Sequence, residues 1–474
     1  DEAAHLTYTM QLGPDGCVVG DPERPCVFNV PALWAYLALV DRDSARVNAG
    51  VLDMGFAPND DFRPPAAGAR VECDFTGLAT TCGPGAATGT PTVGASFFGG
   101  RVYHGTGVVT TLGGVVNDGF GAAGVAGQVA VPMLYEYDTA SYAFEMGAGL
   151  RRATDDGASV INVSASYPCR GLTNVGPDFD LCSPAGRTGI CLVVTAAVQA
   201  AAGLVCAVAG PIPIAGAIAC GAAMTGAAAA VTACTAQLAL GDVRGPLASG
   251  VGYARRAGVP VVTVAGNPIP REVLPEVLRD VVNVDVHRTE AWGLVPAMIP
   301  GTIVVGAVWE DGTNAMFFGD RVDVWAPIES GYVAPEDPDR LTSSLVPQTI
   351  GGTSAAAPYV AGVVAAMQAV NPELDPRAPG TTDEERAGMV DRIRSLLLDD
   401  ASTFDDAELV RLGFTSDAVE RRRLIDPLGA VLAAARGRYP DLGALGYDTS
   451  LGFSELAGTD DRPEDARELP AGET

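Results

Sequence analysis

The chain has 474 residues, of which 48% are apolar and 18% are charged, and its formal net charge is −27. This composition excludes a protein that is disordered throughout, and the length allows one large α/β domain with insertions or about two to three ordinary domains. Every basic residue is an arginine, and the excess of carboxylates repels phosphate groups, so we expect no nucleic-acid partner.

The cysteines indicate an oxidising compartment. The chain holds ten cysteines but only three histidines and no Cys-x-x-Cys, so disulfides explain the cysteines better than zinc sites do. Several cysteines form close pairs along the chain: Cys17 with Cys26, Cys73 with Cys82, and Cys169 with Cys182. We therefore expect a secreted or extracytoplasmic protein, in a periplasm or at a cell surface.

Residues 1–44 are predicted to be an N-terminal extension. They contain a small cysteine loop and then an apolar run, Val30–Leu37, that is typical of a helix. From residue 45 onward, short β-branched runs alternate with helical patterns such as Tyr142–Ala153 and Leu247–Ala257. This alternation predicts a mostly parallel sheet with crossover helices.

Polar residues follow several of the predicted strands. The strands are expected to end at Asp53, near Tyr137, at Ser164, at Asn267, near Trp309 and at Pro327. Functional groups in open α/β sheets gather at the carboxyl ends of the strands. Asp53, Ser164 and Asn267 are therefore candidate site residues.

His104 is the candidate for a general base. It opens a predicted helix with small neighbours, in the run His-Gly-Thr-Gly-Val-Val. An imidazole has a pKa near neutrality, which suits a group that takes a proton from a hydroxyl. The other two histidines are less suitable, because His5 is terminal and His287 lies in a polar stretch without small neighbours.

Residues 168–245 are predicted to be a cysteine-rich insertion that contains a helical hairpin. From Thr188 to Gly241 the chain has no charged residue. The turn Gly210–Ile214 separates two apolar arms, and the cysteine pairs 191/234 and 206/220 are symmetric about it, which predicts an antiparallel hairpin with two nested disulfides. The hairpin either packs against the rest of the chain or uses residues 190–240 to contact a protein partner or a membrane surface.

The segment Gly352–Gly362 places a serine at the start of an apolar helix. It reads Gly-Thr-Ser-Ala-Ala-Ala-Pro-Tyr-Val-Ala-Gly, and the apolar run continues to Val370. The helix dipole and the free N–H groups of a first turn favour negative charge on Ser354. A serine in a Gly-Thr-Ser turn is also a common helix cap, so the segment alone does not establish a nucleophile.

After residue 371 the chain becomes acidic and helical in pattern. Three helices are expected, at Asp383–Leu398, Asp405–Leu412 and Arg423–Arg436. Residues 438–474 are predicted to be an acidic C-terminal tail that is partly disordered.

Four segments together resemble the motifs of the subtilase family. The segment Gly352–Gly362 is similar to the family's nucleophile motif, and the run at His104 resembles its histidine motif. Val47–Gly55 resembles the aspartate motif, and Val259–Asn267 is similar to the oxyanion segment. The chain order Asp, His, Ser is that of subtilisin and differs from the orders in chymotrypsin and the α/β-hydrolases.

The resemblance implies an α/β, subtilisin-like three-layer fold, with a mostly parallel central sheet flanked by helices, in a peptidase domain at residues 45–437. It further implies a secreted serine endopeptidase that hydrolyses peptide bonds. Ser354 would be the nucleophile and His104 its general base, Asp53 would orient the imidazole, and Asn267 would stabilise the oxyanion.

The resemblance also implies where a peptide substrate binds. Ile161–Ser166 resembles the strand that pairs with an extended substrate. The residues expected to contact substrate are Ser164, Ala165, Ser166, Ala265 and Gly266. Three positions depart from the family pattern and bear on substrate preference: Met54 replaces a Ser or Thr, Gly107 replaces a common second histidine, and Ser166 stands where glycine is frequent.

This chemistry requires no cofactor. Calcium is the usual ion of the family, and Asn59-Asp60-Asp61 lies where a structural calcium could bind. Carboxylate clusters in so acidic a chain are most often solvated surface, so we name no metal ligand.

The sequence also leaves open a function other than catalysis. A catalytically silent or highly restricted subtilase-like scaffold could carry the same motifs and bind a protein partner or a membrane surface through its hydrophobic hairpin.

Overall fold

The structure, a computed structural model, describes the parts of the chain that form a central sheet and its covering helices. The described residues are 30–57, 61, 72–74, 81–83, 103–116, 121–137, 142–171, 179–180, 182–183, 244–267, 288–308, 318–335, 345–399, 403 and 423–439. The predictions made for Cys17 with Cys26, the hairpin at 190–240, the helix Asp405–Leu412 and the tail beyond residue 439 lie outside the described residues and stay predictions.

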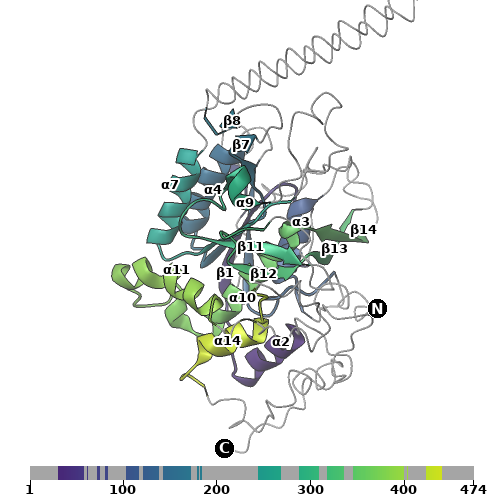
Figure 1. The fold of residues 1–474 in the computed structure, drawn as a ribbon. Helices are drawn as coiled ribbons and strands as arrows, with labels where there is room; N and C mark the ends of the chain where they lie inside the picture. Colours follow the sequence, from purple (N-terminus) through teal and green to yellow (C-terminus); the bar gives the residue numbers. More distant parts are fainter. Residues whose placement is uncertain are drawn as a thin grey trace, which may run out of the picture.

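An eight-stranded sheet forms the centre of the fold (Figure 1), with the strand order β12-β11-β9-β5-β1-β4-β2-β3. In chain order these strands are β1 (Val47–Asp53), β2 (Glu72–Asp74), β3 (Thr81–Cys82), β4 (Ala130–Glu136), β5 (Val160–Val163), β9 (Val261–Val264), β11 (Thr302–Val308) and β12 (Val324–Pro327). Every neighbouring pair is parallel except β2 with β3. The mostly parallel sheet expected from the sequence is confirmed.

Strand β1 marks the point where the chain reverses its direction across the sheet. From β1 the chain passes through helix α3 (His104–Gly113) to β4 on one side, and then through helix α4 (Tyr142–Asp155) to β5 on the other side. Such a topological switch point opens a crevice beyond the carboxyl ends of the strands, where ligands bind. Asp53 is the last residue of β1 and therefore lies at this point.

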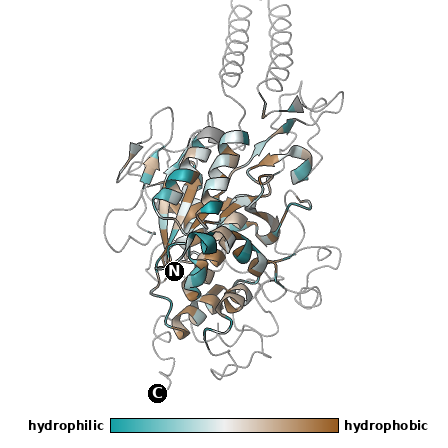
Figure 2. Cartoon of the chain, turned by 90° about the vertical axis from the view of Figure 1, so that its left-hand side faces the viewer, coloured by the Kyte–Doolittle hydropathy of each residue, from teal (hydrophilic) through white to brown (hydrophobic). Residues whose placement is uncertain are grey.

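Helices cover both faces of the sheet, so the fold has three layers (Figure 1). One hydrophobic cluster joins the sheet to α3 and to four other helices: α2 (Val30–Leu39), α10 (Thr353–Val370), α11 (Asp383–Leu397) and α14 (Pro427–Ala435). A second cluster joins the sheet to α4 and α7 (Arg244–Arg256). In Figure 2 the strands at the centre carry many apolar residues, and the helices around them carry both polar and apolar residues.

Helix α10 runs through the larger cluster. All of its residues are buried, which explains why its sequence is apolar on every side. Among the described residues it is the one helix long and apolar enough to cross a membrane, and its complete burial identifies it as a core helix. A short 3₁₀ helix, Pro372–Leu374, follows it.

Two insertions, one between Asp53 and His104 and one between Ser166 and Asn267, contain the two disulfides of the described residues. In the first, Cys73 in β2 lies opposite Cys82 in β3, and a disulfide joins them, so this insertion adds two strands to one edge of the sheet. In the second, a disulfide joins Cys169 to Cys182. Both pairings agree with those expected from the sequence.

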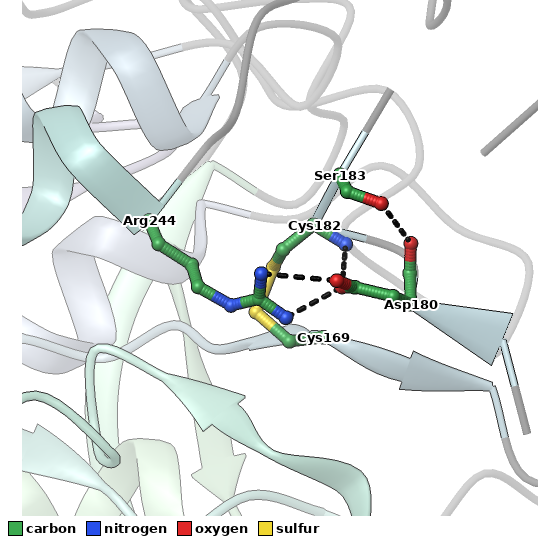
Figure 3. The surroundings of a disulfide bond; sticks show 5 residues. All are labelled: Cys169, Asp180, Cys182, Ser183 and Arg244. Atoms are coloured by element: carbon green, nitrogen blue, oxygen red, sulfur yellow. Dashed lines mark hydrogen bonds and ion pairs between the residues drawn. A yellow bond between two sulfur atoms is a disulfide. The ribbon is translucent and has the colours of Figure 1, made fainter. Parts of the chain in front are cut away.

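An ion pair closes the base of the second insertion beside its disulfide (Figure 3). Strands β7 (Arg170–Gly171) and β8 (Phe179–Asp180) form a short antiparallel ladder. The Asp180 carboxylate accepts hydrogen bonds at 2.5 and 3.1 Å from Arg244, the first residue of α7. Although partial burial acts against it, this contact lowers the pKa of Asp180 below its ordinary value. The two ends of the insertion are thus held together by a covalent bond and an ion pair.

Helix α2 lies in the same hydrophobic cluster as the sheet, although residues 1–44 were expected to form an extension. Trp34 is 4% exposed, and its indole N–H donates a hydrogen bond to the carbonyl of Val125 at 3.0 Å. Helix α2 also packs against α14 near the other end of the described chain. This helix therefore contributes to the core of the fold.

We expect the substitution Trp34→Ala to reduce the free energy of unfolding by about 3–5 kcal/mol, because it opens a cavity in the core and leaves the Val125 carbonyl without its donor. Denaturant unfolding followed by circular dichroism measures the change. Ala38 lies on the exposed side of α2, so Ala38→Ser is the control and should change the stability by less than about 0.5 kcal/mol. Equal stabilities of both variants and the parent would show that α2 is a dispensable extension.

Candidate active site

Asp53 and His104 meet at the carboxyl edge of the sheet. Asp53 is fully buried at the end of β1, and its Oδ1 lies 2.6 Å from Nδ1 of His104. The same Oδ1 accepts the backbone N–H of Met54 at 2.6 Å. The other carboxylate oxygen, Oδ2, is buried and has no hydrogen-bond partner among the residues that the structure describes.

Backbone contacts fix the position of His104. It is the first residue of α3, and the next two N–H groups, those of Gly105 and Thr106, donate to the carbonyls of Met54 and Gly55 at 2.8 and 3.3 Å. The segment after Asp53 is thus bonded to the first turn of the helix that carries His104. These backbone hydrogen bonds bring together two residues that are 51 positions apart in the sequence.

The electrostatic surroundings favour the protonated form of His104. Burial of the ring acts against the imidazolium, but the negative charge and hydrogen bond of Asp53 outweigh it and raise the pKa of His104 above its ordinary value of 6.5. The side chain stays 18% exposed, so the ring can still reach a bound substrate.

Ser354 lies at the same end of the sheet because α3 and α10 run side by side in the same direction. Gly107, near the start of α3, packs against Ile350, just before α10. Further along, Gly362 packs against the carbonyl of Leu112, and a Cβ on Gly362 would lie 3.1 Å from that oxygen. Leu112 follows His104 by as many residues as Gly362 follows Ser354. Since these two later positions are in contact, the first turns of the two helices also lie together, at one edge of the sheet.

The hydroxyl of Ser354 donates to the backbone oxygen of Ser164 at 3.4 Å and makes no hydrogen bond to His104. Ser354 is 7% exposed and lies in the first turn of α10. The N–H groups of the first turn of a helix have no acceptor within that helix. The backbone N–H of Ser354 can therefore donate a hydrogen bond to an anion. Hydrogen bonds between catalytic groups often tighten only when a substrate binds.

Asn267 lies beside Ser354 with a fixed amide orientation. Its Oδ1 accepts two hydrogen bonds from Thr353, from the backbone N–H at 3.0 Å and from the hydroxyl at 2.8 Å. Because Thr353 engages the amide oxygen, the NH₂ group of Asn267 lies on the other side of the amide. It is the end that can donate a hydrogen bond to a bound group. Gly352 makes this approach feasible: its φ is +83°, and a Cβ there would lie 2.8 Å from Nδ2 of Asn267.

The predicted substrate segments extend from neighbouring strands. Ser164–Ser166 follows β5, and Ala265 and Gly266 follow β9. The two strands pair in parallel, and the hydroxyl of Thr263 ties them by donating to the carbonyl of Val163 at 3.1 Å. Ala165 and Ser166 are half-buried, whereas Ser164 and Ala265 are buried. The structure therefore brings both segments to the edge that holds Ser354.

The family of the chain follows from a comparison with known proteins. The sequence model of the Subtilase family matches residues 96–416, well over half of the chain. The chain belongs to the subtilase family. The matched segment contains His104, Asn267 and Ser354, and Asp53 lies before it.

This subtilase is also similar to individual proteins. It is 32% identical over 135 residues to "Subtilisin-like protease 2" of Trichophyton verrucosum, and the same identity and length hold for the protein of that name from Arthroderma otae. These matches cover 28% of this chain and 26% of each relative. Among solved structures, it is similar to a protease of Pseudoalteromonas arctica PAMC 21717, with a TM-score of 0.50 and 18% identity over 86% of this chain and 94% of that one. This structural likeness concerns the fold.

The position where the sequence suggested a calcium ion is only partly described in this subtilase. Asp61 is fully buried, and its Oδ2 accepts the backbone N–H of Ala122 at 3.2 Å. Asn59 and Asp60 lie outside the described residues. No group of three His, Cys, Asp or Glu side chains within the described part could hold a metal ion, and we derive no step through one.

Ser164 has a part in this subtilase that sequence reasoning missed. Pro358 in α10 has no N–H, so the carbonyl of Ser354 lacks its usual partner four residues later. The hydroxyl of Ser164 donates to this carbonyl at 3.1 Å instead, and it accepts a hydrogen bond from Asn162 at 2.9 Å. The proline is visible in the sequence, but the residue that replaces its N–H is 190 positions from Ser354.

We expect Ser164→Ala to reduce the free energy of unfolding by about 1–3 kcal/mol, because it leaves the buried carbonyl of Ser354 unpaired. Adding Pro358→Ala restores a backbone donor, so the double variant should be more stable than the sum of the two single changes allows. Thermal unfolding of the four proteins gives this coupling. Strict additivity of the two substitutions would contradict the exchange of donors.

Proposed function

We propose that this subtilase is a secreted serine endopeptidase that hydrolyses peptide bonds through Asp53, His104 and Ser354. The observation that carries the proposal is the 2.6 Å contact between His104 and Asp53 at the edge where α10 begins. A carboxylate held at Nδ1 fixes the imidazole tautomer, so that Nε2 can accept a proton. Membership of the subtilase family supports the same roles.

The chemistry divides between a nucleophile, a base and two donors. The Oγ of Ser354 attacks the carbonyl carbon of the scissile bond while Nε2 of His104 takes the hydroxyl proton. Asn267 Nδ2 and the backbone N–H of Ser354 stabilise the negative oxygen of the tetrahedral intermediate. His104 then protonates the leaving amine, and a water molecule, deprotonated by His104, hydrolyses the acyl-enzyme.

Asp53 supports the proton transfers of His104 and stays a carboxylate throughout. Its carboxylate lies in the fully buried end of β1, where its interaction with the imidazolium is weakly screened. The charged histidine that forms in the transition state is therefore stabilised by a neighbour that needs no rearrangement. The raised pKa of His104 is the equilibrium expression of this stabilisation.

Main-chain groups are expected to hold the substrate. Ser164–Ser166 leaves the edge of β5 with Ala165 and Ser166 partly accessible, and an extended peptide could add to it as a further strand. Substrate recognition of this kind uses backbone hydrogen bonds, which tolerate many sequences. It supports a peptide or protein substrate.

The two disulfides of the described residues support an extracytoplasmic location, because such bonds persist in oxidising compartments. The contact of residues 190–240 with a protein partner or a membrane surface stays a prediction. In the alternative function, a silent or highly restricted scaffold, this contact would be the main activity of the chain.

A fluorophosphonate probe distinguishes a peptidase from a silent scaffold. We expect the probe to label the folded protein at Ser354, because the attack on phosphorus uses the same hydroxyl and base as the attack on a peptide. Mass spectrometry of the labelled peptide identifies the residue. Ser354→Ala should abolish labelling, whereas Ser249→Ala, at an exposed position of α7, should preserve it.

A folded protein that stays unlabelled at Ser354 would favour the scaffold. Labelling combined with cleavage of a few peptides from a library, but not of casein, would indicate a restricted protease.

The pH dependence of His104 gives a second prediction. Catalysis needs the neutral imidazole, so kcat/KM should fall as the pH drops below the pKa of His104, with a midpoint above 6.5. Asp53→Asn removes the stabilising charge and leaves burial, which lowers the pKa, so the midpoint should move down; kcat should fall by about 10⁴-fold. The raised pKa also contributes stability that is present below pH 6.5 and lost as the pH rises through the folded-state value.

The chain has only three histidines, so ¹³C-histidine labelling allows the pKa of His104 to be read by NMR in the Ser354→Ala background. The signal is assigned with His5→Gln and His287→Gln as controls. A His104 midpoint that does not change in Asp53→Asn would contradict the role of the Asp53 charge.

A further inference from the structure

The two segments next to Ser354 separate at the edge of the sheet. Strands β5 and β9 pair as far as Val163 and Thr263, and no ladder joins the residues that follow them in the described part of the chain. One continuation reaches the hydroxyl of Ser354 through the carbonyl of Ser164. The other reaches Thr353 through Asn267.

A scissile carbonyl between these groups fixes the path of one substrate side chain. In the proposed mechanism its carbon would lie at Ser354 and its oxygen at Asn267, while the peptide backbone would pair with Ser164–Ser166. We call the substrate residue that contributes this carbonyl the acyl residue. Its side chain then has to enter between Ser164–Ser166 and Ala265–Asn267. Whatever closes the space between these segments limits the size of that side chain.

Helix α9 (Thr289–Trp292) and strand β10 (Leu294–Val295) are attached to both segments. Strand β10 pairs in antiparallel fashion with β6 (Tyr167–Pro168), which directly follows Ser166. On the other side, the hydroxyl of Thr289 donates to the carbonyl of Ala265 at 2.9 Å. The α9–β10 unit therefore bridges the two segments where they separate.

The two residues of β10 face opposite sides. Val295 lies in the hydrophobic cluster between the sheet, α4 and α7. Leu294 lies in a separate small cluster with Trp292 and Ala265, which directly precedes Gly266 and Asn267. Leu294 and Trp292 are 4% and 3% exposed, so their bulk fills the side of the unit that faces Ala265.

We propose that Leu294 closes the bottom of the site for the acyl residue, so that this protease cleaves after small residues such as alanine in preference to leucine or phenylalanine. The inference rests on the proposed function and specifies its substrate class. A large side chain would have to displace Leu294 from a close-packed cluster, whereas the methyl group of an alanine demands far less room.

Three chromogenic peptides that differ only in the acyl residue, alanine, leucine or phenylalanine, test the proposal. The parent protein should cleave the alanine peptide with a kcat/KM about tenfold or more above that of the phenylalanine peptide. Leu294→Gly removes the obstructing side chain and should shift the ratio by at least about tenfold toward phenylalanine. Met298→Ala is the control, because Met298 is exposed and lies outside the hydrophobic clusters of Leu294 and Val295, so this substitution should leave the ratio unchanged.

A parent protein that prefers phenylalanine would overturn the proposal, and so would a Leu294→Gly variant with the parent's ratio. If Leu294→Gly does not fold, Leu294→Ala takes its place. Diphenyl phosphonates with alanine-like and phenylalanine-like side chains give a further readout on the parent, through their rates of inactivation. Failure of the proposed function has a different signature, which is the absence of fluorophosphonate labelling at Ser354.

Discussion

The close packing of α3 against α10 places the side chains of His104 and Ser354 at one edge of the sheet. Gly362 lies against the carbonyl of Leu112, and any side chain at that position would push the helices apart. Because both helices run in the same direction, their first turns meet beside the end of β1. His104 and Ser354 thus take their positions from rigid, buried elements, which hold a site more accurately than loops do.

The hydrogen bonds around this edge direct the polar atoms that the chemistry needs. Thr353 engages the oxygen of the Asn267 amide, so the NH₂ group becomes the available end. Ser164 satisfies the carbonyl that Pro358 leaves open, so the first turn of α10 stays ordered around Ser354. Among the described residues, Oδ2 of Asp53 is buried without a donor.

Much of the sheet could be predicted because its signals are local. The β-branched runs before Asp53 and Ser164 gave strands that end within a residue of the expected positions, and α4 begins at Tyr142 as its pattern indicates. The candidate residues Asp53, His104, Asn267 and Ser354 were also visible, because each stands at or shortly after the end of a strand, or at the start of a helix, with small neighbours.

The contacts that orient these residues could not be predicted in the same way. The partnership of Ser164 with Ser354 joins positions 190 apart, and that of Asn267 with Thr353 joins positions 86 apart. Neither leaves a periodic pattern in the sequence. Strand β2 was missed for a related reason, since three residues are too few to show alternation, and its place in the sheet depends on pairing with β4.

The disulfide between Cys169 and Cys182 and the ion pair between Asp180 and Arg244 have a consequence for how such a chain can diversify. They hold together the two ends of the insertion, the first of which lies only a few residues after Ser166. Closing a longer excursion costs little extra entropy once its ends are joined. Evolution can therefore lengthen, shorten or exchange the sequence between these two ends while the edge of the sheet beside Ser354 keeps its geometry, and an engineer could graft a foreign module there.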